Sequence, residues 1–558
     1  MPQKPVFSKS PLLSVPHCFP ANGTVRTTDE RMMRLYEHAS LWIDRPSLWE
    51  GLFRIACLIK NRPMEEPVAS LIIEAIQDND TGSVNGVLSE QVSVIRAAFA
   101  VYQYNTDRSI LQRIALWCRY LEIEFDQLTE QDHSVLYQPA DLMETLVTFY
   151  QVTGLKGVLR LCARLRAAAF NWTTALHTFQ QSIPIQKDSV YPEMPVLTEV
   201  PAAIDFSEKE KLINHGEMLA DGIRYALYSG IYSGNGQDLA AGKTVWRYLK
   251  KHHFALCGGT TANPYLCGCA ADQPVSNRCL AAWTETFSSL LLLPDTEWAA
   301  DELIRIVYNG LDDCLNRPEV YEFQYVNSYN DTSDSSPDPV LLYTRLTRAA
   351  ADTFMRMFTL TEKGIRVNYL LSGKLLVMVK KQPVILTITD DSILFHNKKP
   401  VSCDVEVYMS SGKPSQITLI CGRKEKSLPI NQCVTDTGLY FHIAKKDWQD
   451  TDCIHFETEQ RIICENTHHQ GLCFVSDNRL FSLPVSTENH WFAVSCDPEM
   501  NNGKMTVDIY GTSAWKSGED KADIPVLPEG ISGPVRSELK PYGNTFRRIT
   551  MFPRIKGE

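Results

Sequence analysis

Four cysteines with nearly symmetric spacing are the first residues in this sequence whose type and order could do chemistry. Cys257, Cys267, Cys269 and Cys279 follow the pattern C-x9-C-x-C-x9-C around a predicted loop. Four thiolates would complete the closed shell of a structural zinc site. The spacing matches no specific zinc-ligand pattern, and cysteine often serves as a small buried apolar residue. We expect no cofactor, and we keep zinc at these four cysteines as the alternative.

Other motifs of catalysis are missing from the sequence. There is no Gly-x-Ser-x-Gly elbow to present a nucleophilic serine. Gly234-Asn235-Gly236 follows a predicted helix and has no Lys-Ser or Lys-Thr after it, so it does not form a phosphate-binding loop. We predict an ordinary turn at these residues.

The elements that must position any site are helices in the first part of the chain. Residues from about 30 to about 360 form successive apolar stripes with helical spacing, such as Ile110, Ile114, Trp117 and Leu121. The stripe over 142–149 stops before Gly154, a residue that favours a helix C-terminus. The pattern predicts about ten to twelve helices joined by short turns.

The pattern changes to short strands after about residue 363. The segments 367–371, 375–379 and 384–388 are β-branched runs separated by Gly, Pro or Asp, as is typical of an antiparallel sandwich. We therefore predict an α+β multidomain protein. Its predicted parts are an N-terminal extension (1–30), a helical toroid (31–362) and a β-sandwich region that could hold two small sandwiches (363–558).

Length and charge restrict the class of protein. A chain of 558 residues is too long for one hydrophobic core, which stops growing at roughly 250–300 residues. The net charge of -11 argues against a general binder of nucleic acid or of anionic membranes. The N-terminus has no uninterrupted apolar region of a signal peptide, and no segment reaches the ~18–20 apolar residues of a membrane span. We expect a cytoplasmic protein whose sixteen cysteines are mostly free thiols.

Three segments in the same order resemble the bacterial β-L-arabinofuranosidases of glycoside hydrolase family 127. They are NHGEMLADGIRYALYSG (214–230), RCLAAWTETFSSLLLLPDTEWAADELIRIVYNGL with the following FQYVN (278–311 and 323–327), and PYGNTFRRITMFP (541–553). DLMETLVTFYQVTG (141–154) is a weaker match. The resemblance spans most of the chain and implies an (α/α)6 barrel followed by β-sandwich domains.

The same resemblance implies a mechanism whose residues are largely missing here. The family uses zinc held by three cysteines and a glutamate, one cysteine as nucleophile, and a separate glutamate as acid/base. The family's Glu-x-Cys falls at Asn277-Arg278-Cys279, where only the cysteine remains. Its paired cysteines fall near Leu341-Leu342, and no carboxylate stands between Gly259 and Asp272, where the acid/base is expected. We therefore expect a catalytic apparatus different from that of the family.

Carboxylates at family-cavity positions are the alternative catalytic groups. Glycosidases use two carboxyl groups, ~5–5.5 Å apart in retaining enzymes and ~6.5–9.5 Å apart in inverting ones. Asp141 and Asp221 are the best pair by resemblance, because their family counterparts lie on helices that face the sugar. The alternative for each of them is a solvated carboxylate on a helix face. The full candidate set comprises the catalytic candidates Asp141, Asp221 and Glu217, the further carboxylate Glu285, and the substrate-binding candidates His215, Arg224, Glu322 and Tyr325.

The leading expectation is a bacterial, cytoplasmic glycoside hydrolase that acts on small oligosaccharides, with an arabinofuranoside-like sugar as the substrate by resemblance. The rival is a non-catalytic descendant that binds carbohydrate or serves in assembly. The expected partner is an oligosaccharide or glycoside, not nucleic acid or a membrane. A homodimer through the β region is an open alternative to a monomer.

Overall fold

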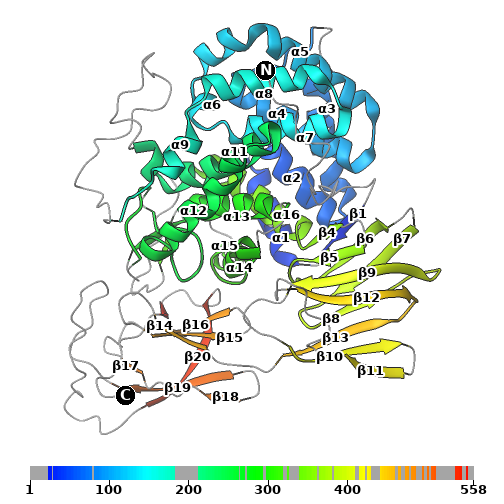
Figure 1. Ribbon diagram of the computed structural model, residues 1–558, viewed down its shortest axis with the longest axis vertical. Helices are drawn as coiled ribbons and strands as arrows, with labels where there is room; N and C mark the ends of the chain where they lie inside the picture. Colours follow the sequence, from blue (N-terminus) through cyan, green and yellow to red (C-terminus); the bar gives the residue numbers. More distant parts are fainter. Residues whose placement is uncertain are drawn as a thin grey trace.

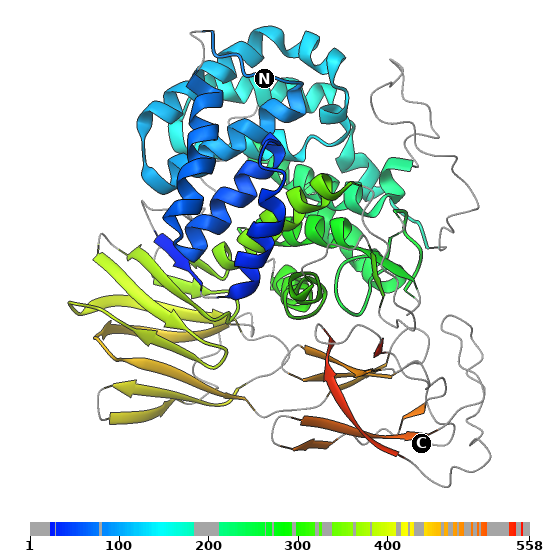
Figure 2. The same cartoon turned by 180° about the vertical axis from the view of Figure 1, so that it is seen from behind.

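The computed structural model has a helical part followed by two β units. It describes residues 23–182, 211–317, 323–325 and 338–550, apart from short gaps within these ranges and the longer gaps 429–439, 485–492 and 511–534. In Figures 1 and 2 the helices occupy one end of the molecule and both β units lie side by side beneath them. The change from helix to strand falls between Met355 and Phe358, close to the predicted change at 363.

Six helices of the helical part pack in a closed order. Helix α2 packs on α4, α4 on α7, α7 on α11, α11 on α13, α13 on α16, and α16 again on α2. The remaining helices cover this ring from outside, for example α5 on α4 and α12 on α11. The bounds are α1 Glu30–Ser40, α2 Pro46–Ile59, α3 Arg62–Gln77, α4 Leu88–Asn105, α5 Arg108–Gln131, α6 Ser134–Tyr137, α7 Ala140–Thr153, α8 Lys156–Ala168, α9 Trp172–His177, α11 Gly216–Ser233, α12 Gly236–His252, α13 Asn277–Leu290, α14 Glu297–Arg305, the π-helix η2 Ile306–Gly310, α15 Leu311–Asn316 and α16 Pro339–Met355.

Local sequence signals explain where the ring helices begin and end. Helix α7 ends at Gly154, which adopts the left-handed conformation (φ 67°) that glycine tolerates without strain. Gly234 ends α11 in the same way, and the Asn235 side chain then accepts a hydrogen bond from the backbone N–H of Gln237 at the start of α12. The predicted helix C-terminus at Gly154 and the turn at 234–236 are both confirmed.

The first β unit consists of two facing sheets. One sheet has the order β1-β6-β7-β8-β13-β10-β11 and the other β12-β9-β5-β4. The rings of Phe395 and Trp448 stack between the two sheets with centroids 4.2 Å apart, in a core built from alternating inward residues. Strand β1 lies in the predicted N-terminal extension and pairs with β6. The strands are β1 Gly23–Arg26, β4 Phe358–Leu360, β5 Gly364–Val367, β6 Gly373–Val379, β7 Gln382–Ile388, β8 Ser392–Phe395, β9 Val401–Tyr408, β10 Pro414–Cys421, β11 Lys424–Leu428, β12 Tyr440–Trp448 and β13 Cys453–Thr458.

The second β unit is built around one antiparallel sheet of order β14-β15-β16-β20-β19-β17, with β18 on β19 and β21 on β16. A separate two-stranded sheet pairs β2 (Pro274–Ser276) with β3 (Phe323–Tyr325). The remaining bounds are β14 Ile463–Asn466, β15 Leu472–Ser476, β16 Arg479–Pro484, β17 Ala493–Val494, β18 Glu499–Asn501, β19 Lys504–Tyr510, β20 Val535–Pro541 and β21 Arg548–Ile549.

The π-helix η2 joins the ring to both β units. The Tyr308 hydroxyl donates to the carbonyl of Leu370 in the first β unit, and Asn309 Oδ1 accepts from the backbone N–H of Leu480 in the second, at 2.7 Å. Gly310 N–H donates to the carbonyl of Cys257. The Tyr-Asn-Gly motif therefore has a structural role in holding the parts together.

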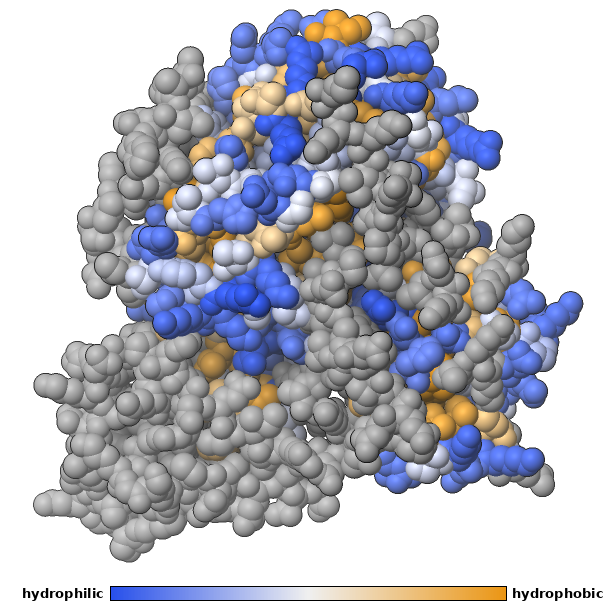
Figure 3. Space-filling model, viewed as in Figure 1, coloured by the Kyte–Doolittle hydropathy of each residue, from blue (hydrophilic) through white to orange (hydrophobic). Residues whose placement is uncertain are grey.

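The described surface of the helical part is mostly polar. On the face in Figure 3, hydrophilic residues predominate over the helices and apolar residues are interspersed among them. No helix among the described residues combines the length and the apolar character needed to cross a membrane.

Candidate functional site

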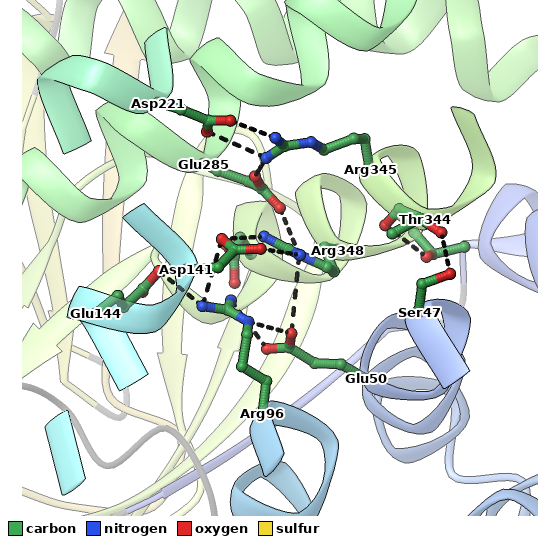
Figure 4. Close-up of polar contacts among 12 residues, drawn as sticks. Ser47, Glu50, Arg96, Asp141, Glu144, Asp221, Glu285, Thr344, Arg345 and Arg348 are labelled. Carbon is green, nitrogen blue, oxygen red and sulfur yellow. Dashed lines mark hydrogen bonds and ion pairs between the residues drawn. The ribbon is translucent and has the colours of Figure 1, made fainter. Parts of the chain in front are cut away.

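Charged side chains from all six ring helices meet inside the ring. Each helix contributes residues with its inward face, which is otherwise apolar, so the charges are buried and can be accommodated only in pairs. Arginines and carboxylates alternate through this cluster, which we call the ionic core (Figure 4). It consists of Glu50 and Arg54 of α2, Arg96 of α4, Asp141 and Glu144 of α7, Glu217, Asp221 and Arg224 of α11, Arg278 and Glu285 of α13, and Arg345, Arg348 and Asp352 of α16.

Arg348 lies at the centre of the ionic core. Its two terminal nitrogens donate to both oxygens of Asp141, each at 2.9 Å, which is the bidentate geometry that favours arginine–carboxylate pairs. Its Nε lies 2.7 Å from Glu285 Oε1 and 3.8 Å from Glu50 Oε2. One guanidinium thus joins carboxylates from three helices.

Arg224 and Arg345 extend the core across α11. Arg224 Nη2 donates to Asp141 at 2.6 Å and to Asp221 at 2.9 Å. Arg345 pairs with both oxygens of Asp221, with Glu285 at 2.7 Å and with Glu217 at 3.1 Å. The structure therefore brings the predicted residues Asp141, Asp221, Glu217 and Arg224 together in one cluster, with Glu285 among them.

The arginines determine the charge of the carboxyl groups. Burial alone would raise the pKa of Asp141, but Arg348, Arg96 and Arg224 hold it well below its usual range. In the same way, burial is outweighed at Glu50, where Arg54, Arg96 and Arg348 lower the pKa to about 2. At Glu285 burial is the stronger effect and raises the pKa, although Arg348, Arg224 and Arg345 oppose it.

Access to these carboxyl groups is very unequal. The Asp141 side chain is 27% exposed, whereas those of Asp221 and Glu285 are 3% and 1% exposed. The oxygens of Asp221 and Glu285 face guanidinium groups of Arg224, Arg345 and Arg348. Asp141 is therefore the one member of the predicted pair that retains substantial contact with solvent.

The other predicted binding residues have different positions. His215 caps α11, where its Nδ1 accepts from the Met218 N–H at 3.5 Å, and its ring lies edge-on to Tyr265. Burial lowers the pKa of His215 to about 4, so its ring is neutral at pH 7. Tyr325 lies in β3 with its backbone paired to Pro274. The side chain of Tyr325 and the whole of Glu322 lie outside the described residues.

Several members of the ionic core were not predicted as site residues. Arg96 lies 46 residues from Glu50, Arg345 lies 60 residues from Glu285, and Arg348 lies 207 residues from Asp141. Sequence spacing therefore does not pair them. The sequence feature that could have identified these arginines is a charge inside an otherwise apolar helical segment, as in VSVIRAAFAV (92–101) and LYTRLTRAAA (342–351). Such a position predicts a buried charge that must find an opposite charge. The sequence analysis also missed five other members of the ionic core as site residues: Glu50, Arg54, Glu144, Arg278 and Asp352.

The residues at the family's zinc positions do not fit that metal. The Asn277 Oδ1 accepts from Gln324 Nε2 at 2.6 Å, and Leu342 is a fully buried apolar side chain. Cys279 is a free thiol in contact with Thr260 Oγ1 at 3.2 Å, and its burial raises the pKa to about 12. An amide already engaged, a leucine and a protonated thiol lack the anionic character that zinc ligands need.

The cysteine series is the other metal site considered from the sequence. Over the described ranges, which include Cys257, Cys267, Cys269 and Cys279, no three histidine, cysteine, aspartate or glutamate side chains are grouped as they would be around a metal ion. Zinc at these cysteines stays an untested prediction. The series lies in the turns before and at the start of α13, where Cys257, Cys267 and Cys279 are buried.

Comparison with known proteins identifies the fold. Neither a family model nor a curated protein matches the sequence. A solved "Glycoside hydrolase" matches over 96% of this chain and 97% of its own, with 10% identity and a TM-score of 0.71. A GH127 β-L-arabinofuranosidase from Geobacillus stearothermophilus T6 matches over 94% and 92%, with 12% identity and a TM-score of 0.62. A second GH127 β-arabinofuranosidase matches over 98% of both chains, with 13% identity and a TM-score of 0.64. The chain therefore has a GH127-like fold.

Proposed function

We propose that this chain is a non-catalytic carbohydrate-binding protein built on a glycoside hydrolase scaffold, with its ring of six helices as an (α/α)6 toroid. The observation that carries the proposal is the ionic core: every carboxylate in it is within ion-pair distance of at least one arginine. A glycosidase that works by carboxylates needs two of them flanking the scissile bond. Here guanidinium groups occupy the space around them.

The cysteine-nucleophile mechanism of glycoside hydrolase family 127 also has no support in this chain. A nucleophilic cysteine acts as the thiolate, which an apolar burial site disfavours. Cys279 has neither an anionic metal site beside it nor a lowered pKa. We therefore place carbohydrate binding, rather than cleavage, at the N-terminal end of the ring helices. There the side chains of Asp141 and Arg278 are 27% and 29% exposed and can hydrogen-bond sugar hydroxyls.

A second candidate function is glycoside hydrolysis by carboxylates. It is favoured by the opposite pKa shifts of Asp141 and Glu285, since enzymes separate their base and acid by such environments. Asp141 Oδ1 lies 2.6 Å and Glu285 Oε2 lies 3.7 Å from the same atom, Arg224 Nη2. The two carboxylate oxygens are therefore no farther apart than the sum of these two distances. In this hypothesis Asp141 is the ionised base or nucleophile and Glu285 the acid, and a substrate must displace Arg224 or Arg348.

The test is release of nitrophenol from a panel of nitrophenyl furanosides and pyranosides, combined with calorimetric titration of arabino-oligosaccharides. We expect binding without turnover, whereas working hydrolases reach about 1–10³ s⁻¹. Asp141→Asn should weaken this binding, and Cys279→Ser should leave it unchanged. Turnover that disappears in Asp141→Asn and persists in Cys279→Ser would replace our proposal by the carboxylate mechanism. Absence of both turnover and binding would reject a carbohydrate function at this end of the ring.

A further inference from the structure

A polar cavity lies at the C-terminal end of the ring helices. It has a volume of about 50 Å³ and is lined by C-terminal residues of these helices, from Gln103 of α4 and Gln151 of α7 to Ile231 of α11 and Met355 of α16. Five residues of the ionic core form its floor: Glu50, Arg54, Arg96, Glu144 and Asp352. The family's catalytic positions are at the opposite end, near Asn277 at the start of α13. Helix α13 alone has 14 residues, about 20 Å of helix. The cavity therefore lies at the other end of the ionic core from Arg278 and the start of α13.

The cavity contains polar atoms that have no partner among the described residues. Gln103 is 9% exposed, and its Oε1 is a buried acceptor for which the described part of the chain provides no donor. Arg54 Nε is a buried donor for which the described residues provide no acceptor, although the terminal nitrogens of Arg54 pair with Glu50 and Asp352. Leaving a buried polar group without a hydrogen-bond partner is unfavourable, so such groups usually have a bound partner.

The two unsatisfied atoms restrict the chemistry of that partner. Gln103 Oε1 requires a donor, and Arg54 Nε requires an acceptor. An anion only accepts and an ammonium group only donates, whereas a hydroxyl does both. The charges around the cavity also favour a neutral ligand, because Glu50 and Asp352 are already paired with Arg54.

The walls of the cavity match a hydroxyl-bearing carbon chain. The hydroxyl oxygens of Thr145 and Tyr228 can accept from a ligand, since their hydrogens are donated to the Asp141 carbonyl and to Glu144 Oε1. The Thr148 hydroxyl can donate or accept, and the ring of Phe99 provides an apolar wall. Each water-sized group needs roughly 10–15 Å³ of such space, so the cavity accommodates a few of them at once. We propose that this cavity is a binding site for a small neutral polyol, such as glycerol or a short sugar alcohol. This inference does not depend on whether the protein binds or cleaves oligosaccharides at the other end.

The experiment uses the full chain and three probes, glycerol, erythritol and L-arabinose, in ligand-observed NMR and calorimetric titration. We expect millimolar binding of at least one probe, with inorganic phosphate and ammonium failing to compete. Gln103→Leu, which removes the unsatisfied acceptor at nearly constant volume, should weaken binding at least about tenfold. The matched control is Gln127→Leu on the exposed face of α5, which should bind like the wild type.

Three results would overturn the inference. They are no binding of any probe to the wild type, equal binding by Gln103→Leu, or competition by phosphate. If Gln103→Leu does not fold, Thr148→Leu on the half-buried wall of the same cavity tests the same point. A crystal of the protein grown with the best probe that shows only water in the cavity would also refute it. Failure here leaves the oligosaccharide titration unaffected, because that titration depends on Asp141.

Discussion

Replacing Arg348 by methionine removes the central cation of the ionic core and tests whether that core stabilises the ring. Methionine keeps most of the length of the side chain and cannot pair with a carboxylate. The substitution leaves Asp141 without its bidentate partner at 2.9 Å and Glu285 without the ion pair at 2.7 Å. The Arg348 side chain is 6% exposed, so water cannot replace these contacts fully.

The expected loss of stability follows from the burial of the partners. Removing one partner of a buried ion pair costs about 3–5 kcal/mol, and the 27% exposure of Asp141 puts this case at about 3 kcal/mol. For a large domain this corresponds to a fall in melting temperature on the order of 5–10 °C. In the double variant with Asp141→Asn, the uncompensated charge is gone and part of the loss should be recovered.

The loss of stability caused by Arg348→Met must also depend on pH. The three neighbouring arginines hold the pKa of Asp141 in the folded protein below its value of about 3.9 in the unfolded chain. Its contribution to stability is therefore present above that pH and lost as pH falls through the folded pKa. Arg348→Met raises the folded pKa, so the gap between variant and wild type should be widest near pH 7 and shrink below about pH 4.

The assay is thermal and urea unfolding followed by circular dichroism from about pH 7 to about pH 3.5. The matched control is Arg160→Met, which removes an ion pair with Glu122 on the surface, where the arginine side chain is 68% exposed, and should melt like the wild type. If Arg348→Met melts with the wild type at pH 7, or if its defect does not depend on pH, the ionic core does not stabilise the ring as argued.

Three further predictions concern the residues around α13 and η2. Gly258→Ala should be strongly destabilising, because φ is +96° and a Cβ would lie 2.5 Å from a side-chain carbon of η2. Gly236→Ala, with nothing within 4 Å, should be neutral in the same melting assay. The Cys279 thiol, with its pKa raised to about 12 by burial, should react with iodoacetamide at pH 8 at least about a hundredfold more slowly in the folded than in the unfolded protein, as measured by peptide mass spectrometry. Gln324→Leu should cost about 1–3 kcal/mol in urea unfolding because it leaves the Tyr542 hydroxyl and Asn277 without this partner, and Tyr542→Phe should cost less.

The layout of the fold was predictable because apolar periodicity is local information. The stripe Ile110, Ile114, Trp117 and Leu121 is buried in α5, and the helix that it indicated is present. Short β-branched runs after residue 363 likewise predicted antiparallel strands such as β6 and β7. The second β unit was less predictable, because its sheet depends on pairing between segments as distant as β16 and β20.

The candidate site was only partly predictable, because ion pairs connect residues far apart in sequence. Arg348 and Asp141 are 207 residues apart, and nothing in their spacing shows that they meet. Asp141, Glu217, Asp221 and Arg224 were identified through resemblance, but the expectation of a sugar-facing pair omitted the arginines around them. Because Arg345 and Arg348 are three residues apart on α16, both face the ring interior and supply the countercharges.

The segments that resemble the family have a structural role that does not depend on catalysis. The Phe-x-Tyr and Pro-Tyr-Gly segments meet through a buried chain of hydrogen bonds, from the Tyr542 hydroxyl to Gln324 Oε1 at 3.1 Å and from Gln324 Nε2 to Asn277 Oδ1 at 2.6 Å. A substitution within such a chain leaves a buried polar group unsatisfied, and this penalty applies whatever the protein does. Asn277, at the position of the family's zinc-binding glutamate, belongs to this chain of hydrogen bonds as an uncharged acceptor. The hydrogen-bonded segments therefore indicate the fold, and the function has to be inferred from the ionic core inside the ring.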